Sequence, residues 1–315
     1  MSATTSLPAV SIVMPCFNGA AHLPQSVGSV LRQTFENWEL IVVDDGSTDT
    51  SFAWLESQTD ARLVLMHQSN QGVSAARNAG LARARAEYVA FLDADDTWAP
   101  SFLERLYGAL LAQPQAVLAY CGWQNLGLAG GRGQPFVPPE YETPQKREIL
   151  FAGCRWPVHA ALSKREAVLA AGGFETALKN AEDYALWLEL AATAPIVRVP
   201  EVLAFYHFHG GVQASTNRAR AALHLLHAQQ QYLARHPDFA TVLGRKRRRK
   251  LLYSNLLREG FDCYWKRDIP AARTLFRHSM SVGFGQPKEW LYMLPCLLPE
   301  KLHARLIGWM EWRRK

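Results

Sequence analysis

The sequence predicts an α/β fold in which a mostly parallel central sheet is flanked by helices and followed by an all-helical C-terminal region. Apolar strand-like segments alternate with segments of helical spacing over residues 10–123, and this alternation is typical of parallel βαβ units. From residue 214 onward the spacing is helical throughout. We therefore expect one domain at residues 1–212 and a helical extension at 213–315.

Composition restricts the class of protein. The chain is 49% hydrophobic and 20% charged, which is typical of a packed globular protein and not of a disordered one. The run Arg245–Lys250 contains six basic residues and accounts for the whole formal net charge of +6. We expect no nucleic-acid partner, because nucleic-acid binding needs basic residues spread over a face.

The five cysteines include no Cys-x-x-Cys pair, which argues against a zinc site. No signal peptide is recognisable at the start, so we expect a cytoplasmic protein.

The predicted sheet is built from continuous apolar segments, which suit strands buried on both faces. Strands are expected at Val10–Phe17, Trp38–Val43, Arg62–Met66, Tyr88–Leu92 and Ala116–Trp123. Apolar residues at helical spacing predict intervening helices, at Ala20–Thr34, shortly after Asp49, at Val73–Ala86 and at Pro100–Leu111.

Polar residues follow three of these strands directly. Asn18 follows the first strand, the pair Asp44 and Asp45 follows the second, and a group of three aspartates follows Leu92. Because ligands of such sheets bind outside the carboxyl ends of the strands, we expect these side chains to share one site. The alternative is that each residue serves only the turn in which it lies.

The acidic group after Leu92 is a candidate metal site. If the strand continued through it, alternation would place Asp93 and Asp95 on one side, about 7 Å apart. Oxygen ligands of this kind suit Mg²⁺ or Mn²⁺. The alternative is an acidic turn in which Asp96 or Thr97 caps the next helix.

The second half of the chain begins with a glycine- and proline-rich stretch, interpreted as a flexible loop and a hinge at Gly127–Gly133 and Pro135–Pro144. Further elements are expected beyond it: a helix at Gln145–Phe151, an extended segment at Val158–Leu162, a helix at Lys164–Ala171 and strands at Ile196–Val199 and Val202–Phe208.

A helix is also expected from Asn180 onward. Asn180 can cap this helix, and Asp183 three residues later would complete a pair resembling a capping box. A carboxylate held at a helix start could equally act as a general base.

The C-terminal region is expected to form about five helical segments, separated near Pro237, Gly260, Pro270, Gly283 and Pro299. The run Arg245–Lys250 is either a solvated helix face or a surface attracted to anionic lipid. The segment Lys301–Lys315 mixes apolar and basic residues, as an interfacial helix or a helix packed on the protein would.

No Gly-x-Gly-x-x-Gly follows the first strand and no P-loop motif occurs, which disfavours both kinds of nucleotide site. The motifs that are present together resemble the inverting glycosyltransferases of family 2, which adopt the GT-A fold. The resemblance covers residues 9–212 and rests on Val10–Asn18, Val43–Asp49, Asn70–Asn78, Asp93–Asp95, and Gly172–Phe174 followed by Glu182–Asp183.

The resemblance implies a nucleotide-sugar donor, most often UDP-linked, lying over the strand ends. The implied donor-binding residues are Pro15, Phe17, Asn18, Asp45, Arg77, Asp93 and Ala94. Phe17 stands where relatives usually have tyrosine. Asp95 would bind Mn²⁺ or Mg²⁺ together with a histidine, either His207 or His209, and Asp183 would be the catalytic base.

The acceptor is implied to be a saccharide or a lipid-linked molecule of cell-surface polysaccharide or glycolipid synthesis, with the enzyme at the inner face of the membrane. Weak candidates for acceptor contact are Trp156, His159 and Glu182, although core packing is an equal alternative for the two aromatic residues. Two other functions remain open, a sugar nucleotidyltransferase and a non-catalytic protein that binds nucleotide-sugars.

Overall fold

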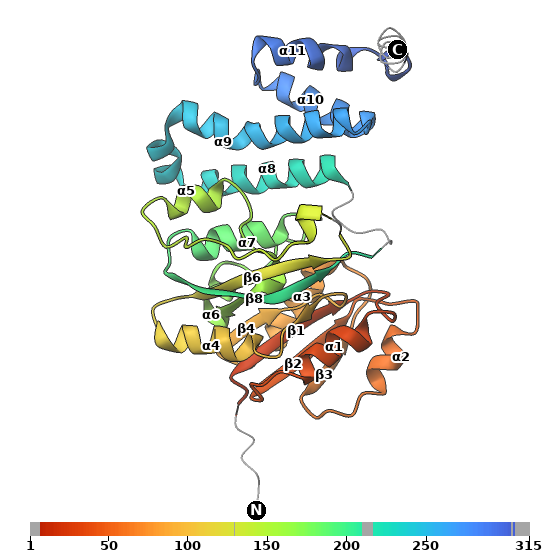
Figure 1. The fold of residues 1–315 in the computed structure, drawn as a ribbon, viewed down its shortest axis with the longest axis vertical. Coiled ribbons are helices and arrows are strands. Elements are labelled where there is room, and N and C mark those ends of the chain that lie inside the picture. Colours follow the sequence, from red (N-terminus) through yellow and green to blue (C-terminus); the bar gives the residue numbers. More distant parts are fainter. Residues whose placement is uncertain (1–6, 129, 210–216, 304, 306–315) are drawn as a thin grey trace, which may run out of the picture. The chain divides into compact units, whose positions relative to one another are not determined.

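A computed structural model describes residues 7–128, 130–209, 217–303 and 305. The chain divides into two compact units, Met1–Gly211 and Val212–Lys315, whose elements are labelled in Figure 1.

The first unit contains an eight-stranded mixed sheet with the strand order β3-β2-β1-β4-β7-β6-β8-β5. The strands are β1 Val10–Cys16, β2 Trp38–Asp44, β3 Leu63–His67, β4 Tyr88–Phe91, β5 Thr97–Trp98, β6 Leu118–Leu126, β7 Ala161–Lys164 and β8 Ile196–His207. Strands β3, β2, β1 and β4 are all parallel, as is the pair β6 and β8. β7 runs antiparallel to β4 and β6, and β5 runs antiparallel to β8. The predicted α/β class with a sheet flanked by helices is confirmed.

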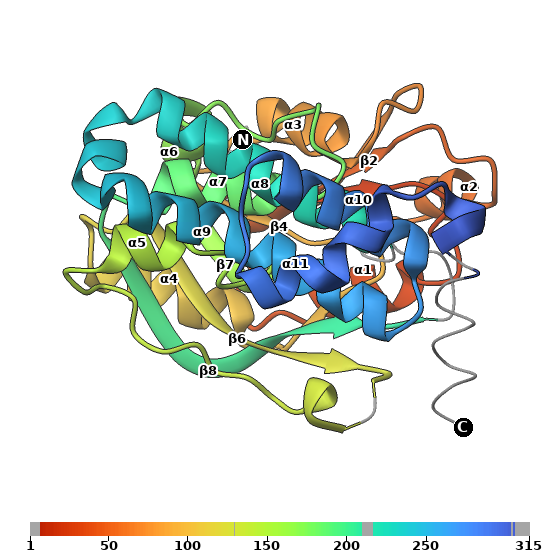
Figure 2. The same cartoon turned by 90° about the horizontal axis from the view of Figure 1, so that it is seen from above.

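Helices flank this sheet, as Figure 2 shows from above. They are α1 Leu23–Leu31, α2 Ser51–Glu56, α3 Val73–Arg83, α4 Phe102–Ala112, α5 Lys146–Phe151, α6 Arg165–Ala170 and α7 Glu182–Ala191. Helix α3 packs on β1 and β2. Gly80 permits this close approach, because a Cβ atom there would lie 2.4 Å from Cγ1 of Val13.

The loops of the first unit depart from the sequence predictions in two places. Strand β4 ends at Phe91, and the next residues turn, with the Asp96 N–H donating to the Asp93 carbonyl at 3.1 Å. The assumption of strand alternation through Asp95 is therefore wrong. Capping of the next helix by Asp96 or Thr97 is also wrong, because α4 follows Ser101 and the intervening Thr97 begins β5.

Two further segments differ from prediction. The two strands expected after Pro195 are one strand, β8, whose register against β6 shifts around Gly122. The segment expected to be extended begins as a 3₁₀ turn at Val158–Ala160 and becomes strand β7 only at Ala161. Another 3₁₀ turn, Gly130–Gly133, lies in the glycine-rich loop.

The second unit is helical, as predicted. Its helices are α8 Arg218–Arg235, α9 Pro237–Trp265, α10 Ile269–Ser281 and α11 Pro287–Met293, followed by a 3₁₀ turn at Leu294–Leu297. The break predicted near Gly260 is wrong, because Gly260 lies inside α9 and a Cβ atom there would lie 2.9 Å from the Phe276 ring. The irregularity in α9 lies instead at Gly244, where φ is 65°.

Within the part of the chain that the structure describes, no helix combines the length and apolarity that crossing a membrane requires. Most of the predicted interfacial segment Lys301–Lys315, namely residue 304 and residues 306–315, lies outside the described residues.

Candidate active site

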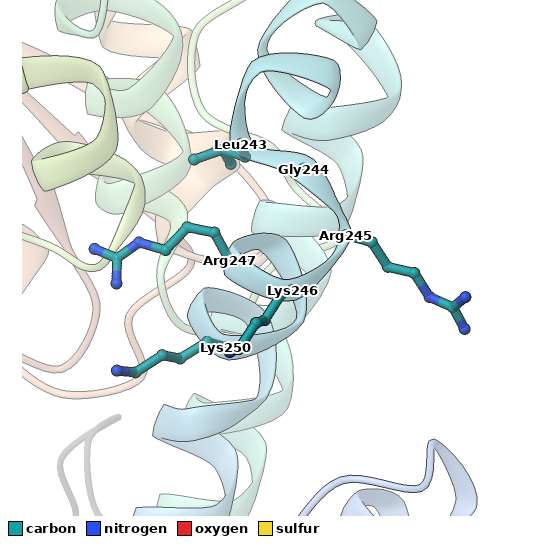
Figure 3. Close-up of a pocket in the computed structure, with 6 residues that line it drawn as sticks. All are labelled: Leu243, Gly244, Arg245, Lys246, Arg247 and Lys250. Atoms are coloured by element: carbon teal, nitrogen blue, oxygen red, sulfur yellow. The ribbon is translucent and has the colours of Figure 1, made fainter.

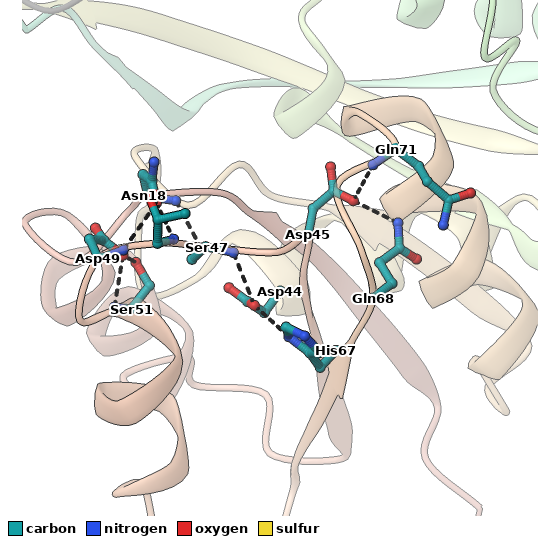
Figure 4. Close-up of polar contacts among 10 residues, drawn as sticks. Asn18, Asp44, Asp45, Ser47, Asp49, Ser51, His67, Gln68 and Gln71 are labelled. Carbon is teal, nitrogen blue, oxygen red and sulfur yellow. Dashed lines mark hydrogen bonds and ion pairs between the residues drawn. The ribbon is translucent and has the colours of Figure 1, made fainter.

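Asn18 ties the loop after β1 to the loop after β2 (Figure 4). Its backbone is left-handed, with φ of 52°, a conformation that asparagine tolerates better than most residues. The Asn18 Oδ1 atom accepts the N–H of Thr48 at 2.8 Å and that of Asp49 at 3.3 Å. In return, the Asn18 N–H donates to Ser47 Oγ at 2.9 Å. The two loops are thus fixed to one another at the end of the parallel strands.

Asp45 is buried, and its carboxylate is occupied by protein donors (Figure 4). Its Oδ1 atom accepts from Gln68 Nε2 at 2.7 Å and from the Gln71 N–H at 2.9 Å. Its Oδ2 atom accepts from the Gly72 N–H at 2.8 Å. Asp45 therefore clamps the loop that leads into α3. The preceding Asp44 is also buried, with Oδ2 2.8 Å from Nδ1 of His67.

Arg77 connects the end of β4 to the start of α7. Its side chain is only 3% exposed. Nη2 lies 2.6 Å from Asp93 Oδ1, and Nη1 lies 2.9 Å from Glu182 Oε1. Burial alone would lower the pKa of Arg77, but the carboxylates of Asp93 and Glu182 raise it above its usual range. The guanidinium therefore stays charged and holds two distant segments together.

Asp95 and His209 form the more accessible part of the acidic edge. The Asp95 Oδ2 atom lies 2.9 Å from His209 Nε2, and the two side chains are 34% and 30% exposed. The His209 ring also stacks on His22, with 4.5 Å between the centroids. His207 lies apart, with its Nε2 2.9 Å from Thr97 Oγ1. The sequence analysis left His207 and His209 as alternative partners of Asp95, and His209 is the one that lies beside it.

A buried pair, Asp96 and His159, supports this edge from inside. His159 Nδ1 lies 3.0 Å from Asp96 Oδ2, and both side chains are 1% exposed. Burial raises the pKa of Asp96. Burial alone would lower the pKa of His159, but the Asp96 carboxylate raises it overall. Asp96 Oδ1 also accepts the His207 N–H at 3.0 Å, so the pair connects the acidic turn to the end of β8. Sequence reasoning missed this role, since no spacing rule relates residues 96 and 159.

Asp183 lies in the first turn of α7. The N-cap residue of this helix is Ala181, with φ of 60°, and its side chain makes no capping hydrogen bond. The N-cap position predicted for Asn180 is therefore wrong, and so is the capping-box spacing to Asp183 that was counted from it. Asp183 Oδ1 accepts the N–H of the adjacent Tyr184 at 2.7 Å, and Cys154 Sγ lies 3.8 Å from Oδ2. Burial, followed by the neighbouring Glu182 carboxylate, raises the pKa of Asp183 to about 6.

The remaining predicted donor residues lie at the ends of β1 and β4. Pro15 is a buried residue of β1, and Phe17 is exposed just beyond it. The carbonyl of Ala94, in the acidic turn, accepts a hydrogen bond from Ser26 Oγ at 2.8 Å. This bond ties the turn to α1.

The two aromatic candidates for acceptor contact lie in the interior. Trp156 is 1% exposed and stacks on Tyr120 at 4.7 Å between centroids, while His159 is paired with Asp96. Of the two alternatives that the sequence allowed, the structure shows the packing contacts. Acceptor contact by these residues stays a prediction.

The carboxylate of Asp95 and the imidazole of His209 suit a divalent cation that takes only some of its ligands from the protein. Carboxylate oxygen and imidazole nitrogen both bind Mn²⁺, and carboxylate also suits Mg²⁺. Across residues 7–303, apart from the stretches not described, no group of three or more His, Cys, Asp or Glu side chains is arranged to hold a metal ion. Other ligands would have to come from a diphosphate and from water, as is usual for Mg²⁺ sites.

Comparisons of the sequence identify relatives. The family model described as "Glycosyl transferase family 2" matches residues 11–152. An uncharacterized glycosyltransferase of Haemophilus influenzae is 31% identical over 225 residues, covering 69% of this chain and 86% of that protein. The O-antigen biosynthesis protein RfbC of Myxococcus xanthus is 31% identical over 245 residues, covering 75% of this chain but only 19% of RfbC.

Comparisons of the structure identify similar folds. TarS 1–349 of S. aureus has a TM-score of 0.59 at 18% identity, covering 94% of this chain and 82% of that one. The mannosyltransferase PcManGT of Pyrobaculum calidifontis, solved with GDP-Man and Mn²⁺, has a TM-score of 0.56 at 20% identity, covering 95% and 83%. At these identities the likeness concerns the fold, and the predicted GT-A fold with a helical C-terminal region is confirmed.

Proposed function

Because the chain belongs to glycosyltransferase family 2, we propose that it moves a sugar from a nucleotide-diphosphate donor to an acceptor hydroxyl with inversion at the anomeric carbon. The observation that carries this proposal is the bridge made by Arg77. Its contacts with Asp93 and Glu182 join the strand-end edge to the helix that bears Asp183. A donor subsite and a candidate base thus belong to one connected network. The proposed catalytic domain is residues 1–212.

The donor is proposed to be a UDP-sugar lying over the ends of β1, β2 and β4. TarS has been solved with UDP-GlcNAc, and its fold resembles this one. Phe17 offers an exposed ring for stacking a base, and the loop fixed by Asn18 lies beside it. Asp45 holds the adjoining loop, and Arg77 holds the acidic turn. The other proposed donor-binding residues are Pro15, Asp93 and Ala94.

Asp95 and His209 are the residues proposed to hold Mn²⁺ or Mg²⁺. Such an ion supplies Lewis-acid stabilisation of the charge that grows on the departing diphosphate. The chain itself contributes orientation. The Asp96–His159 pair fixes the turn that carries Asp95. His22 stacks on the imidazole ring of His209 and fixes its orientation.

Asp183 is the proposed general base. It accepts the proton of the acceptor hydroxyl as that oxygen attacks the anomeric carbon from the side opposite the diphosphate. One displacement of this kind inverts the configuration. A pKa of about 6 leaves the carboxylate ionised at neutral pH and more basic than an ordinary aspartate, which favours proton transfer.

The acceptor is proposed to be a saccharide or lipid-linked molecule of cell-surface polysaccharide or glycolipid synthesis. Membrane-surface contact through Arg245–Lys250 and Lys301–Lys315, on the cytoplasmic side, would place the enzyme near such an acceptor. The support is the basic run itself and the relationship to an O-antigen biosynthesis protein.

The test is a thermal-shift panel of nucleoside diphosphates and nucleotide-sugars, with and without Mn²⁺. A ligand that binds only the folded state raises the melting temperature by mass action, by an amount set by its concentration relative to Kd. We expect metal-dependent stabilisation by UDP or a UDP-sugar, lost in Asp95→Ala. Stabilisation by UTP, with release of pyrophosphate from UTP when it reacts with a sugar phosphate, would indicate a nucleotidyltransferase instead. No response to any nucleotide would contradict the proposed donor class.

A further inference from the structure

The second unit contains a groove lined by basic residues from α9 and by the segment that follows α10. Its volume is about 610 Å³. Its cationic lining consists of Lys246, Arg249, Lys250 and Arg258, and Phe261 and Phe284 supply aromatic walls. These side chains gather on one side because residues three and four apart on a helix are neighbours.

The positive charge of this groove is only partly balanced by carboxylates among the described residues. Glu289 is the acidic residue in the groove lining, and its Oε2 atom already accepts the Gln286 N–H at 2.5 Å at the start of α11. Arg249 donates to the carbonyls of Val282 and Gly283 at 2.7 and 3.0 Å, which fixes its position. Lys246 and Lys250 form no ion pair with any described residue. Arg258 Nη2 lies 3.4 Å from Glu259 Oε1, so its charge is partly balanced, whereas the charges of Lys246 and Lys250 are not. The excess of positive charge suits an anionic ligand.

An exposed apolar surface borders the groove at Phe261. The Phe261 ring lies 6.1 Å from the ring of Tyr292, which in turn lies 5.9 Å from the ring of Trp265. Several large apolar side chains around these rings are exposed. We name this set the apolar rim: Trp265, Leu291, Tyr292, Leu294, Leu297 and Leu298. Leu291 is 71% exposed and Trp265 is 54% exposed. An apolar surface of this kind marks a docking site.

We propose that this groove and the apolar rim form a docking site for an anionic phospholipid surface. In this arrangement Lys246, Lys250 and Arg258 contact lipid phosphates, while the leucines insert and Tyr292 and Trp265 lie at headgroup level. Basic side chains beside tyrosine, tryptophan and leucine are the combination that interfacial surfaces use. A second copy of the chain would bring one basic groove against another, which like charges oppose. The inference deepens the membrane contact proposed above.

The basic run does not act as one uniform patch in this arrangement. Arg245 lines no part of the groove, although it borders a neighbouring pocket together with Lys246 and Lys250. Its side chain points away from that of Lys250, as Figure 3 shows. The thickness of a helix with its side chains, about 10 Å, is comparable to the distance over which physiological salt screens charge. Arg245 therefore provides a control within the same run, which separates the effect of the position of a charge from the effect of the total charge.

The test is flotation of the full-length protein with phosphatidylcholine vesicles, with and without phosphatidylglycerol. We expect binding to the anionic vesicles. Lys246→Gln with Lys250→Gln should weaken it on the order of 30-fold, since each basic residue near the surface contributes roughly fivefold. Arg245→Glu changes the net charge by the same two units and should leave binding nearly unchanged. Leu291→Ser should weaken binding on the order of tenfold.

Three outcomes would overturn the proposal. Equal losses in Arg245→Glu and in the double variant would mean that only overall charge matters. Equal flotation with neutral vesicles would remove the role of the groove. Binding of single-stranded RNA with the same dependence on Lys246 and Lys250, without flotation, would identify a different partner. Flotation requires no turnover, so a failure here is distinguishable from a failure of the proposed transferase activity.

Discussion

The two aspartates at the ends of the proposed site differ in the hydrogen-bond donors that surround their carboxylates. Asp45, beyond β2, accepts three hydrogen bonds from the loop that it clamps. Asp183, in the first turn of α7, accepts the adjacent Tyr184 N–H and the weak thiol donor of Cys154 at 3.8 Å, and it lies beside another carboxylate. The first carboxylate is engaged by three protein donors, whereas burial opposes the ionisation of the second and raises its pKa.

This difference supports the proposal that Asp183 is the reactive carboxylate of the site. A carboxylate surrounded by N–H donors holds its loops in place and has little remaining capacity for a proton. A half-buried carboxylate with few donors retains basicity, because its protonated form is less disfavoured. The same contrast exists within the acidic turn, where Asp96 is buried against His159 and Asp95 is accessible.

The largest effect is expected from Asp183→Asn. The amide cannot accept the proton of the acceptor, so kcat should fall by about 10²–10⁴-fold, the usual contribution of a general base. Stabilisation by UDP with Mn²⁺ should persist, because donor contacts lie elsewhere. The measurement is steady-state transfer combined with the thermal shift.

Glu166→Gln, the same chemical change at an exposed position of α6, is the matched control and should retain full activity. Turnover in Asp183→Asn equal to that of this control would remove Asp183 from the role of base.

Much of the fold could be predicted because the strands are encoded locally. Segments such as Val10–Cys16 and Trp38–Asp44 are buried along their whole length, so a predominantly apolar run was a sufficient signal. The helix break assigned to Gly260 failed for a non-local reason. That glycine accommodates Phe276 of the next helix, and a local pattern does not record a packing partner.

The site was predictable in its members but not in its contacts. Polar residues after three parallel strands indicated one shared edge, and the family motifs indicated their roles. Sequence reasoning assigned Arg77 to the donor alone, and its bridge to Glu182 spans 105 positions of the chain. The direction of Asp95 could not follow from alternation, because the chain turns after Phe91. Long-range pairs and loop geometry require the tertiary structure.

A smaller effect, measured as a loss of stability, is expected from Asp45→Asn. The amide of asparagine must direct an N–H₂ group toward at least one of the N–H donors of Gln68, Gln71 and Gly72, since both carboxylate oxygens are acceptors now. A lost hydrogen bond to a charged group costs about 2 kcal/mol. Urea denaturation should show this decrease in the free energy of unfolding.

Asp183→Asn provides the comparison for that measurement and should be no less stable than the unmodified protein at neutral pH, because it removes a carboxylate whose ionisation burial opposes. If both variants lost the same stability, the proposed distinction between the two aspartates would be wrong.

The smallest effect is the pH dependence of transfer. The base acts in its ionised form, and the pKa of Asp183 is about 6 against an ordinary value of 3.8. Lowering the pH from about 7 to about 5 should therefore reduce kcat/KM about tenfold, as the carboxylate becomes protonated. An aspartate with the ordinary pKa would stay ionised over this interval, and the rate would hardly change.

The same raised pKa has a consequence for stability that distinguishes Asp183 from other groups titrating near pH 6. Protonation of Asp183 favours the folded state, so its contribution to stability is present at low pH and is lost as the pH rises through about 6. Asp183→Asn should abolish this component of the melting-temperature profile. A change in kcat/KM near pH 6 without that component would assign the titration to a group other than Asp183. Measuring UDP stabilisation across the same range would then separate donor binding from proton abstraction.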